Sequence, residues 1–507
     1  MADGGRSLSE QADHRASVAG EINAARAISG GTKLLAARLA AQFIRLAFTV
    51  VLARILAPQD YGLVASVQVI TGLAVLLQDM GLSAATLQRK HISEAQIHAL
   101  YWLNLLLGGC VAGLGLLSAP YIAAWLRSPD SVGVIQVLLV AVLIPSASAQ
   151  HRALMQRELR FGAIALSSVC GTLIGGACAV MAAVAGAGPW ALVLMMVVAD
   201  AVTLIISWAA ARYHPGIPKN FAGVASLLHF GGGFLMFRVL GHFAQNLHLL
   251  LLSRNMGFAA AGQFTRAHML TNMASGYVNE PAGKVALPML SRLISEPRRF
   301  VRFYDKATGV MMLAAAPLGV MGVLYGSQVI HVLLGEQWEA AEQIFQVLCF
   351  GLIAQPLMYS TGWLYMARGD MRGMLIWGCI GWGAMLIAAL VALRFGPLGV
   401  AWAWSGTQWV LLVPCLVAAY RHLPLRTSVA LLRASRPVAA ALVAAVLVKA
   451  TFSSLTGLPM WAELIGATAL FGPAYLLLAW FVFGQRQLMQ TLAETVFKRI
   501  QSMQGRR

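Results

Sequence analysis

Long apolar runs separated by short polar connections repeat along almost the whole chain. A helix that crosses a bilayer needs about 20 such residues. The runs fall at residues 33–56, 62–79, 97–118, 131–150, 163–185, 190–211, 226–252, 260–290, 307–333, 340–366, 373–393, 398–420, 438–456 and 461–483. This pattern predicts an all-α integral membrane protein with about 14 transmembrane helices.

The basic residues alternate between the two sides of these predicted spans. Of the 37 Lys and Arg residues, 27 lie in one set of alternate connections, which includes both chain ends. The other set holds Arg54, Arg127, Arg254 and Arg394. Because Lys and Arg concentrate in cytoplasmic loops, both termini are predicted to be cytoplasmic. The net charge of +18 then reflects topology and not nucleic-acid binding, which needs a basic patch on a soluble face.

The composition leaves little room for a soluble part. Apolar residues make up 59% of the chain and charged residues 11%, against about 25% charged in soluble domains. The sequence shows no Ser/His/Asp, Walker or metal-ligand spacing. We therefore expect no enzymatic chemistry, no metal and no cofactor, apart from a proton or sodium ion that could drive a transport cycle.

The first twelve runs form two similar halves. Residues 200 positions apart match in order, as the pairs Arg38 and Arg238, Gln42 and His242, Arg54 and Arg254, and Gly62 and Gly262 show. Six spans per half give both halves the same orientation in the membrane, as in transporters built from parallel repeats. We predict a polar cytoplasmic tail over 1–30, lobes over 31–212 and 222–421, two extra spans over 437–483 and a basic cytoplasmic tail over 484–507.

Polar side chains line one face of the first and the seventh runs. The first carries Arg38, Gln42 and Arg45 at helical spacing, and the seventh carries the matching set Arg238, His242 and Gln245. A charge near the bilayer centre costs at least ~2.5 kcal/mol, so these side chains are predicted to face a substrate cavity. Snorkelling to the interface or pairing between helices is the alternative.

The eighth run is the most polar, and Arg266 and Lys284 are its candidate substrate-binding residues. Glu280 lies one turn before Lys284, so an i, i+4 ion pair is the structural alternative. Asp200 in the sixth run is the other deep acid. An acid inside a membrane is a candidate proton or cation site, so Asp200 and Glu280 are the coupling candidates.

Two further patterns concern packing and interfaces. Gly171 and Gly175, four residues apart, predict a close helix–helix contact. Four tryptophans fall at predicted outer boundaries, as an aromatic belt does: Trp125, Trp190, Trp338 and Trp461.

One segment of the chain resembles a known signature. Residues 52–62 (LARILAPQDYG) are similar to the Ala-Arg-x-Leu-x-Pro-x-x-(Phe/Tyr)-Gly motif of bacterial polysaccharide-repeat-unit flippases of the Wzx type. These belong to the multidrug/oligosaccharidyl-lipid/polysaccharide exporter superfamily. Further matches follow in order at 79–82 (DMGL), 88–90 (QRK), 101–104 (YWLN), 157–161 (RELRF), 288–292 (PMLSR), 334–338 (LGEQW) and 367–370 (ARGD). One departure is His248, which stands where such proteins commonly carry Asp.

The resemblance implies a two-lobed bundle with a central cationic cavity. Such a protein moves a polyprenyl-pyrophosphate-linked oligosaccharide outward across the bacterial inner membrane, for exopolysaccharide, capsule or O-antigen synthesis. Its expected partners are the lipid-linked substrate, membrane lipids, and a polysaccharide polymerase with its chain-length regulator. The cationic stripes agree with this, because a pyrophosphate needs cations along a desolvated path.

Three other functions remain open from the sequence. A multidrug or cation antiporter of the same fold should carry acids in its cavity. Here the Lys/Arg expected inside the membrane are Arg38, Arg45, Arg238, Arg266, Lys284 and Lys449, against the clear acids Asp79, Asp200 and Glu280. A membrane glycan polymerase or ligase should carry paired catalytic residues on an extended outer loop, and none occurs in the sequence. A scaffold subunit of an envelope complex would not need repeated cationic stripes.

Overall fold

Helices make up every regular element in the described part of the chain. The computed structural model describes residues 40–79, 86, 92–217, 224–421, 423–453, 459–486 and 489–490, with the backbone alone for 79 and 224–237. Arg38, the tail over 1–30 and most of the tail over 484–507 lie outside the described residues.

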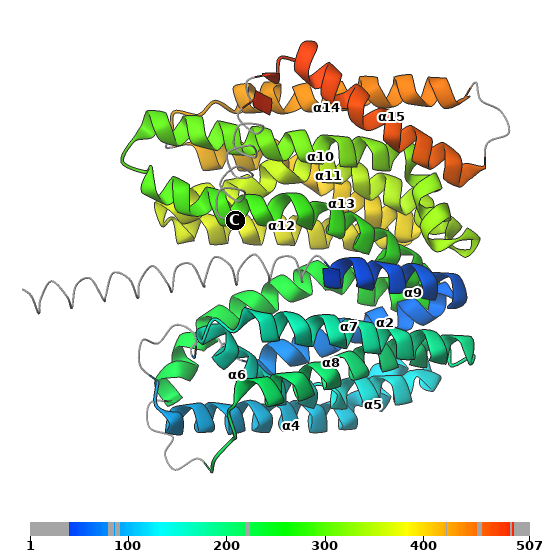
Figure 1. Cartoon of the computed structure of the whole chain (residues 1–507), viewed down its shortest axis with the longest axis vertical. Helices are drawn as coiled ribbons and strands as arrows, with labels where there is room; N and C mark the ends of the chain where they lie inside the picture. Colours follow the sequence, from blue (N-terminus) through cyan, green and yellow to red (C-terminus); the bar gives the residue numbers. More distant parts are fainter. Residues whose placement is uncertain are drawn as a thin grey trace, which may run out of the picture. The chain divides into compact units, whose positions relative to one another are not determined.

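The helices follow one another with short connections (Figure 1). A helix over residues 40–55 comes first. The others are α2 (Pro58–Asp79), α4 (Glu94–Trp125), α5 (Val132–Val140), α6 (Leu143–Arg157), α7 (Phe161–Val184), α8 (Pro189–Ala211), α9 (Val224–Arg292), α10 (Pro297–Leu334), α11 (Glu339–Arg368), α12 (Met371–Ala392), α13 (Gly396–Tyr420), α14 (Thr427–Ser453) and α15 (Met460–Phe481), with short 3₁₀ turns η1 (Pro129–Ser131), η2 (Glu336–Trp338) and η3 (Leu393–Phe395).

The all-helical, membrane-spanning fold class is confirmed. Ten helical stretches among the described residues are long and apolar enough to cross a membrane. One of these ten stretches, 371–420, contains both α12 and α13, whereas the more polar α9 is not among the ten. The count of fourteen spans and the cytoplasmic termini stay predictions.

The chain divides into two compact units, Met1–Phe243 and Ala244–Arg507. The division falls inside α9, about twenty residues after the position predicted for the start of the second lobe, 222. His242, just before the division, contacts α2 of the first unit, with its Nε2 2.7 Å from the carbonyl oxygen of Val69. Gly72 of α2 makes room for this ring, because a Cβ there would stand 2.8 Å from His242 Cε1.

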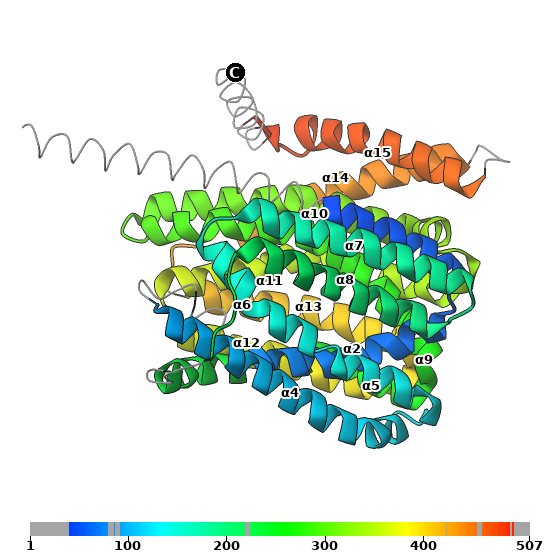
Figure 2. The same ribbon diagram turned by 60° about the horizontal axis from the view of Figure 1, so that its bottom comes forward.

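Within the first unit, α7 and α8 form a tight hairpin (Figure 2). A Cβ on Gly171 would stand 2.7 Å from the carbonyl oxygen of Ala199, and one on Gly175 would stand 2.6 Å from that of Met195. The two backbones therefore touch where only hydrogen fits, which confirms the predicted glycine packing face.

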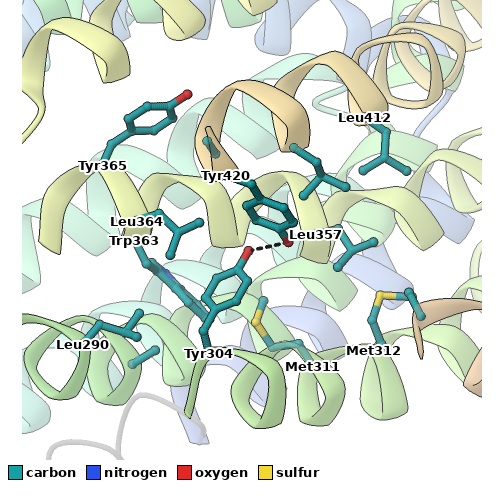
Figure 3. Close-up of a cluster of buried hydrophobic side chains, with 14 of the residues drawn as sticks. Leu290, Tyr304, Met311, Met312, Leu357, Trp363, Leu364, Tyr365, Leu412 and Tyr420 are labelled. Carbon is teal, nitrogen blue, oxygen red and sulfur yellow. Dashed lines mark hydrogen bonds between the residues drawn. The ribbon is translucent and has the colours of Figure 1, made fainter. Parts of the chain in front are cut away.

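Large side chains of α9, α10, α11 and α13 fill the core of the second unit (Figure 3). Tyr304 and Trp363 are each 1% exposed, and Leu290 and Leu364 are fully buried. Tyr304 Oη lies 2.8 Å from Ser360 Oγ and 3.2 Å from Tyr420 Oη, so the phenol is hydrogen-bonded where it is buried.

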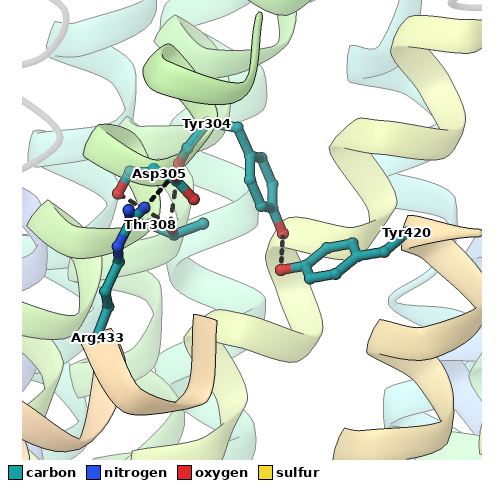
Figure 4. Close-up of polar contacts among 5 residues, drawn as sticks. All are labelled: Tyr304, Asp305, Thr308, Tyr420 and Arg433. Carbon is teal, nitrogen blue, oxygen red and sulfur yellow. Dashed lines mark hydrogen bonds and ion pairs between the residues drawn. The ribbon is translucent and has the colours of Figure 1, made fainter. Parts of the chain in front are cut away.

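The two C-terminal helices pack on α10 of this unit. The α14 face is a stripe of alanines that includes Ala440, Ala441 and Ala444, all with no exposed surface. Small residues let helix backbones approach closely in a membrane protein. An ion pair between Arg433 of α14 and Asp305 of α10 adds a polar contact at one end of this interface (Figure 4).

The predicted aromatic belt is wrong at one of its four positions. Trp125, Trp190 and Trp461 are 39%, 44% and 58% exposed, as a belt requires. Trp338 has no exposed surface, because η2 turns the chain inward between α10 and α11 and this indole fills the turn.

Candidate functional site

A cavity of about 460 Å³ lies inside the second unit, between α9, α11, α12 and α13. This size is within the range of small-molecule sites, about 300–1,000 Å³. Two parts of α9 contribute to it, residues 244–249 and 264–272. They belong to two helices joined at Gly257, whose φ of 83° and ψ of 170° break the helical backbone. This joint lets one continuous segment supply two walls of the cavity.

The α12 wall of the cavity combines large aromatic side chains with two glycines. Its lining residues are Trp377, Gly378, Gly381, Trp382 and Met385, which share one helix face because they recur every four residues. No heavy atom lies within 4 Å of the point where a Cβ on either glycine would stand. The cavity is therefore open at this face because two positions carry no side chain.

The opposite walls are rich in amides and hydroxyls. Gln245, Asn246, Thr265 and Asn272 line the cavity from α9, and Gln355 lines it from α11. A chain of hydrogen bonds behind this surface holds one of these amides. The hydroxyl of Ser275 donates to Gln355 Oε1, and Asn279 Nδ2 donates to Ser275 Oγ at 2.9 Å. Gln355 is therefore oriented before any ligand arrives.

Two histidines form the inner end of the cavity. The rings of His248 and His268 have centroids 6.3 Å apart, and His268 stacks on Phe264 with centroids 5.5 Å apart. His248 is 4% exposed. The Nδ1 atoms of both histidines are buried without a hydrogen-bond partner in the part of the chain that the structure describes. Because a buried polar atom without a partner is costly, these nitrogens are suited to a polar ligand.

The lining of this cavity has no formal charge apart from what the histidines could carry. Its residues include no Asp, Glu, Lys or Arg within the described ranges. Of the eight substrate-binding residues predicted from the sequence, Gln245 lines it. Among the expected cationic residues, Arg45, Arg238, Arg266 and Lys284 do not line this cavity, and Arg38 is outside the described residues.

The first unit brings Arg45 together with Asp200. Both side chains are exposed in the structure, and Arg152 and Arg45 act electrostatically on the Asp200 carboxylate. Asp200 therefore lies within the electrostatic reach of two guanidinium groups. Arg152 falls in a predicted connection, between the runs 131–150 and 163–185, but α6 extends to Arg157 and includes this residue, whose side chain is exposed. The physical reason for this difference is that α6 continues past the apolar run.

The remaining predicted residues occupy varied environments. Gln42 is half-buried on the first helix, and Arg238 is exposed on α9. His242 is held by α2 and serves the packing of the first unit.

The eighth predicted span contains the pair expected from its spacing. Lys284 Nζ lies 4.0 Å from Glu280 Oε2, with both side chains largely exposed. Arg266 Nη1 lies 3.4 Å from the sulfur of Met269, one turn away along α9. The ion pair supports the structural role that i, i+4 spacing indicates.

Comparison with known proteins places the chain in a protein family. Residues 51–343 match the family model described as "Polysaccharide biosynthesis protein". That match spans more than half of the chain. The chain belongs to this family.

The chain is also similar to a curated protein and to solved structures. The lipopolysaccharide biosynthesis protein WzxC of Escherichia coli (strain K12) is 30% identical over 323 residues, which cover 63% of this chain and 65% of that protein. The alignment thus spans slightly less than two thirds of the relative.

The fold is that of known membrane transporters. The lipid II flippase MurJ, in an inward closed conformation, superposes with a TM-score of 0.73 at 12% identity and covers 90% of this chain and 99% of its own. An inward-facing multidrug resistance MATE family transporter of the MOP superfamily gives 0.63 at 13% identity, over 75% and 94% of the two chains. These likenesses, together with the apolar helices, make this family member a multi-pass membrane protein.

The region matched by the family model contains only part of the cavity lining. It ends at residue 343, so it includes the α9 walls but not α11 beyond its first turn, α12 or α13. Trp377, Trp382 and Trp404, together with Gln355, Thr407 and Gln408, lie outside the matched region. Sequence reasoning missed these residues because tryptophans in apolar runs look like membrane-facing rings. The spacing of Trp377, Gly381 and Met385 on one helix face is the signal that could have found them.

Proposed function

We propose that this member of the polysaccharide biosynthesis family is a flippase for polyprenyl-pyrophosphate-linked oligosaccharides in the bacterial inner membrane. The observation that carries the proposal is a cavity of about 460 Å³ lined by amides, hydroxyls and rings within a bundle of apolar helices. Such a lining cannot serve packing in lipid, because polar groups there cost free energy unless they are paired. A polar cargo that crosses the membrane supplies the pairing.

The pyrophosphate is assigned to arginines of the first unit. Arg45 and Arg238 are exposed there, on the first helix and on α9. A guanidinium binds phosphate oxygens through two parallel hydrogen bonds, which fixes the group's orientation as well as its charge. Arg38, Gln42, Gln245, Arg266 and Lys284 complete the predicted substrate path, as the sequence pattern indicates.

Asp200 is the proposed coupling residue. The Asp200 carboxylate interacts electrostatically with Arg45 and Arg152. The phosphate of an arriving substrate therefore competes with this carboxylate for the same two guanidinium groups. Binding of a proton or a sodium ion at Asp200 would release the arginines to the substrate. Glu280 is the weaker coupling candidate because Lys284 already neutralises it.

A drug or cation antiporter of the same fold is the second candidate. It is disfavoured by the cavity lining, which offers a cationic ligand no carboxylate within the described ranges. A glycan polymerase or ligase would make bonds, whereas the proposed transport requires none. A polymerase and a chain-length regulator are proposed as partners that use the exported units.

The test is translocation in reconstituted vesicles. Purified protein is placed in proteoliposomes with a fluorescent polyprenyl-pyrophosphate oligosaccharide, and an external glycosidase measures the fraction of head groups that reach the outside. We expect protein-dependent cleavage of the inner pool. If the glycosidase cleaves only the outer-leaflet head groups in vesicles with the protein, as it does in vesicles without it, the flippase function is excluded.

A further inference from the structure

The cavity of the second unit suits one part of such a substrate and not the rest. Three indole rings line it, those of Trp377, Trp382 and Trp404. Amide side chains are the main polar groups, among them Gln355 and Gln408. Within the described residues, none of the lining side chains is Asp, Glu, Lys or Arg. The site is therefore large and polar but uncharged.

A sugar ring matches these two kinds of surface. One face of a pyranose presents C–H groups with a small positive charge, and the face of an indole is negative, so the two stack. The rim of the ring carries hydroxyls that both donate and accept. Amides and hydroxyls also do both, so they can satisfy such a rim whichever way each hydroxyl turns.

A charged group does not match this surface. A carboxylate or phosphate that leaves water without a cation to meet it loses far more free energy than a neutral hydroxyl does. The unpartnered Nδ1 atoms of His248 and His268 offer hydrogen bonds at the buried end. With each ring neutral, they add no fixed charge.

We propose that this cavity is a binding site for uncharged sugar residues, neutral hexoses, deoxyhexoses or N-acetylhexosamines, in the oligosaccharide head group. It excludes uronic acids and the pyrophosphate, which stay outside it. The proposal rests on the proposed flippase function and adds a selectivity to it. The cavity takes the sugar end of the cargo.

The two α12 glycines provide a direct test. At Gly381 a Cβ would meet no heavy atom within 4 Å, and the backbone there is helical, so Gly381→Leu fills the cavity without strain. Gly383 on the same helix also meets no heavy atom within 4 Å, yet it does not line the cavity. Gly383→Leu is therefore the matched control for the added volume.

Binding is measured on the full-length purified protein in nanodiscs by saturation-transfer NMR. The probes are methyl glycosides of glucose, galactose, mannose, rhamnose, N-acetylglucosamine, N-acetylgalactosamine and glucuronic acid, together with tetramethylammonium. We expect at least one neutral glycoside to bind the wild type. Binding should weaken about tenfold or more, which is about 1.4 kcal/mol, in Gly381→Leu and in Trp377→Ala, and stay unchanged in Gly383→Leu.

Several results would overturn the proposal. They are the absence of binding by every neutral glycoside, equal binding in Gly381→Leu and the wild type, or binding of the glucuronide or tetramethylammonium at least as strong as that of the neutral sugars. Thermal midpoints of all variants show whether each is folded. Because this readout is equilibrium binding, vesicle translocation without sugar binding would defeat this proposal alone, and sugar binding without translocation would defeat the flippase function alone.

Discussion

At the scale of single residues, the proposed transport depends on a few charged side chains. Arg45 is exposed on the first helix, and with Arg152 it acts on the Asp200 carboxylate. A guanidinium in this position lies in the field of a carboxylate. A phosphate that binds the guanidinium then competes with this carboxylate for the same positive charge.

Removing the guanidinium at position 45 should stop transport without loss of the protein. Arg45→Ala gives up a charge-assisted contact worth about 1.5–3 kcal/mol, so we expect at least about a tenfold slower translocation in the vesicle assay. Arg45→Lys should restore part of the rate, because a point charge remains but the two-pronged geometry is lost. Arg238→Ala should behave as Arg45→Ala does.

The control for these variants is Arg372→Ala, at the exposed start of α12. It should keep the wild-type rate. Wild-type translocation in Arg45→Ala or in Arg238→Ala would remove that arginine from the substrate path.

Asp200 should matter for turnover and not for binding. Asp200→Asn keeps shape and hydrogen bonding but removes the negative charge that interacts electrostatically with Arg45 and Arg152. We expect lipid-linked units to accumulate on the inner leaflet of cells, while the purified variant still binds substrate. The leaflet distribution is read from glycosidase accessibility in intact and inverted vesicles.

A double variant sharpens this prediction. If the carboxylate works through Arg152, Arg152→Gln combined with Asp200→Asn should be less harmful than the two separate effects added together. If the Asp200→Asn variant exports at the wild-type rate, the Asp200 carboxylate serves only helix packing, and Glu280 becomes the coupling candidate.

At the scale of the helix, a single backbone joint positions the cavity. Gly257 has φ 83° and ψ 170° inside α9, a conformation that side chains with a Cβ rarely adopt. Residues 244–249 and 264–272 lie on the two sides of this joint and form two cavity walls. Gly188 and Gly396 likewise have positive φ, Gly188 directly before α8 and Gly396 as the first residue of α13, and a proline follows each of them.

A side chain at Gly257 should strain this joint. Gly257→Ala forces alanine into a region that costs about 1–3 kcal/mol, so the thermal midpoint of the purified protein should fall. Gly276→Ala, later in α9, is the control, because its Cβ would stand 3.9 Å from Glu280 Oε1, an ordinary contact. Equal midpoints for the two variants would contradict the strain at position 257.

At the scale of the whole molecule, topology follows from the distribution of basic residues. The set of connections rich in Lys and Arg is predicted to face the cytoplasm. A reporter that is active in the cytoplasm should therefore be active when fused after Lys219 or Arg436. The same reporter should be silent when fused after Gly188 or Trp338. The reverse pattern at either pair would refute the fourteen-span topology.

Sequence alone predicts those parts of the molecule that depend on local composition. The helices follow from apolar runs, and the α7–α8 contact follows from Gly171 and Gly175, because four-residue spacing places both on one face. The Glu280–Lys284 pair follows from the same rule.

The cavity and the neighbours of Asp200 depend on how distant helices meet. Arg152 comes near Asp200 because α6 packs on α8, which no local pattern encodes. Trp377 lies in an apolar helix that could turn any face to lipid, so its inward direction is set by the contact between α12 and α13. For the same reason Trp338 was assigned to the surface and is buried.

The open space beside Gly378 and Gly381 has a consequence for how such proteins diversify. Single-base changes in a glycine codon give alanine, serine, valine and other side chains of graded size. At these two positions a Cβ would meet no heavy atom of a neighbouring side chain or helix within 4 Å, so a small side chain such as alanine or serine displaces no neighbour. A lineage could therefore follow changes in its own surface glycan by small mutational steps, each of which trims or reshapes the accepted sugar while the protein still folds.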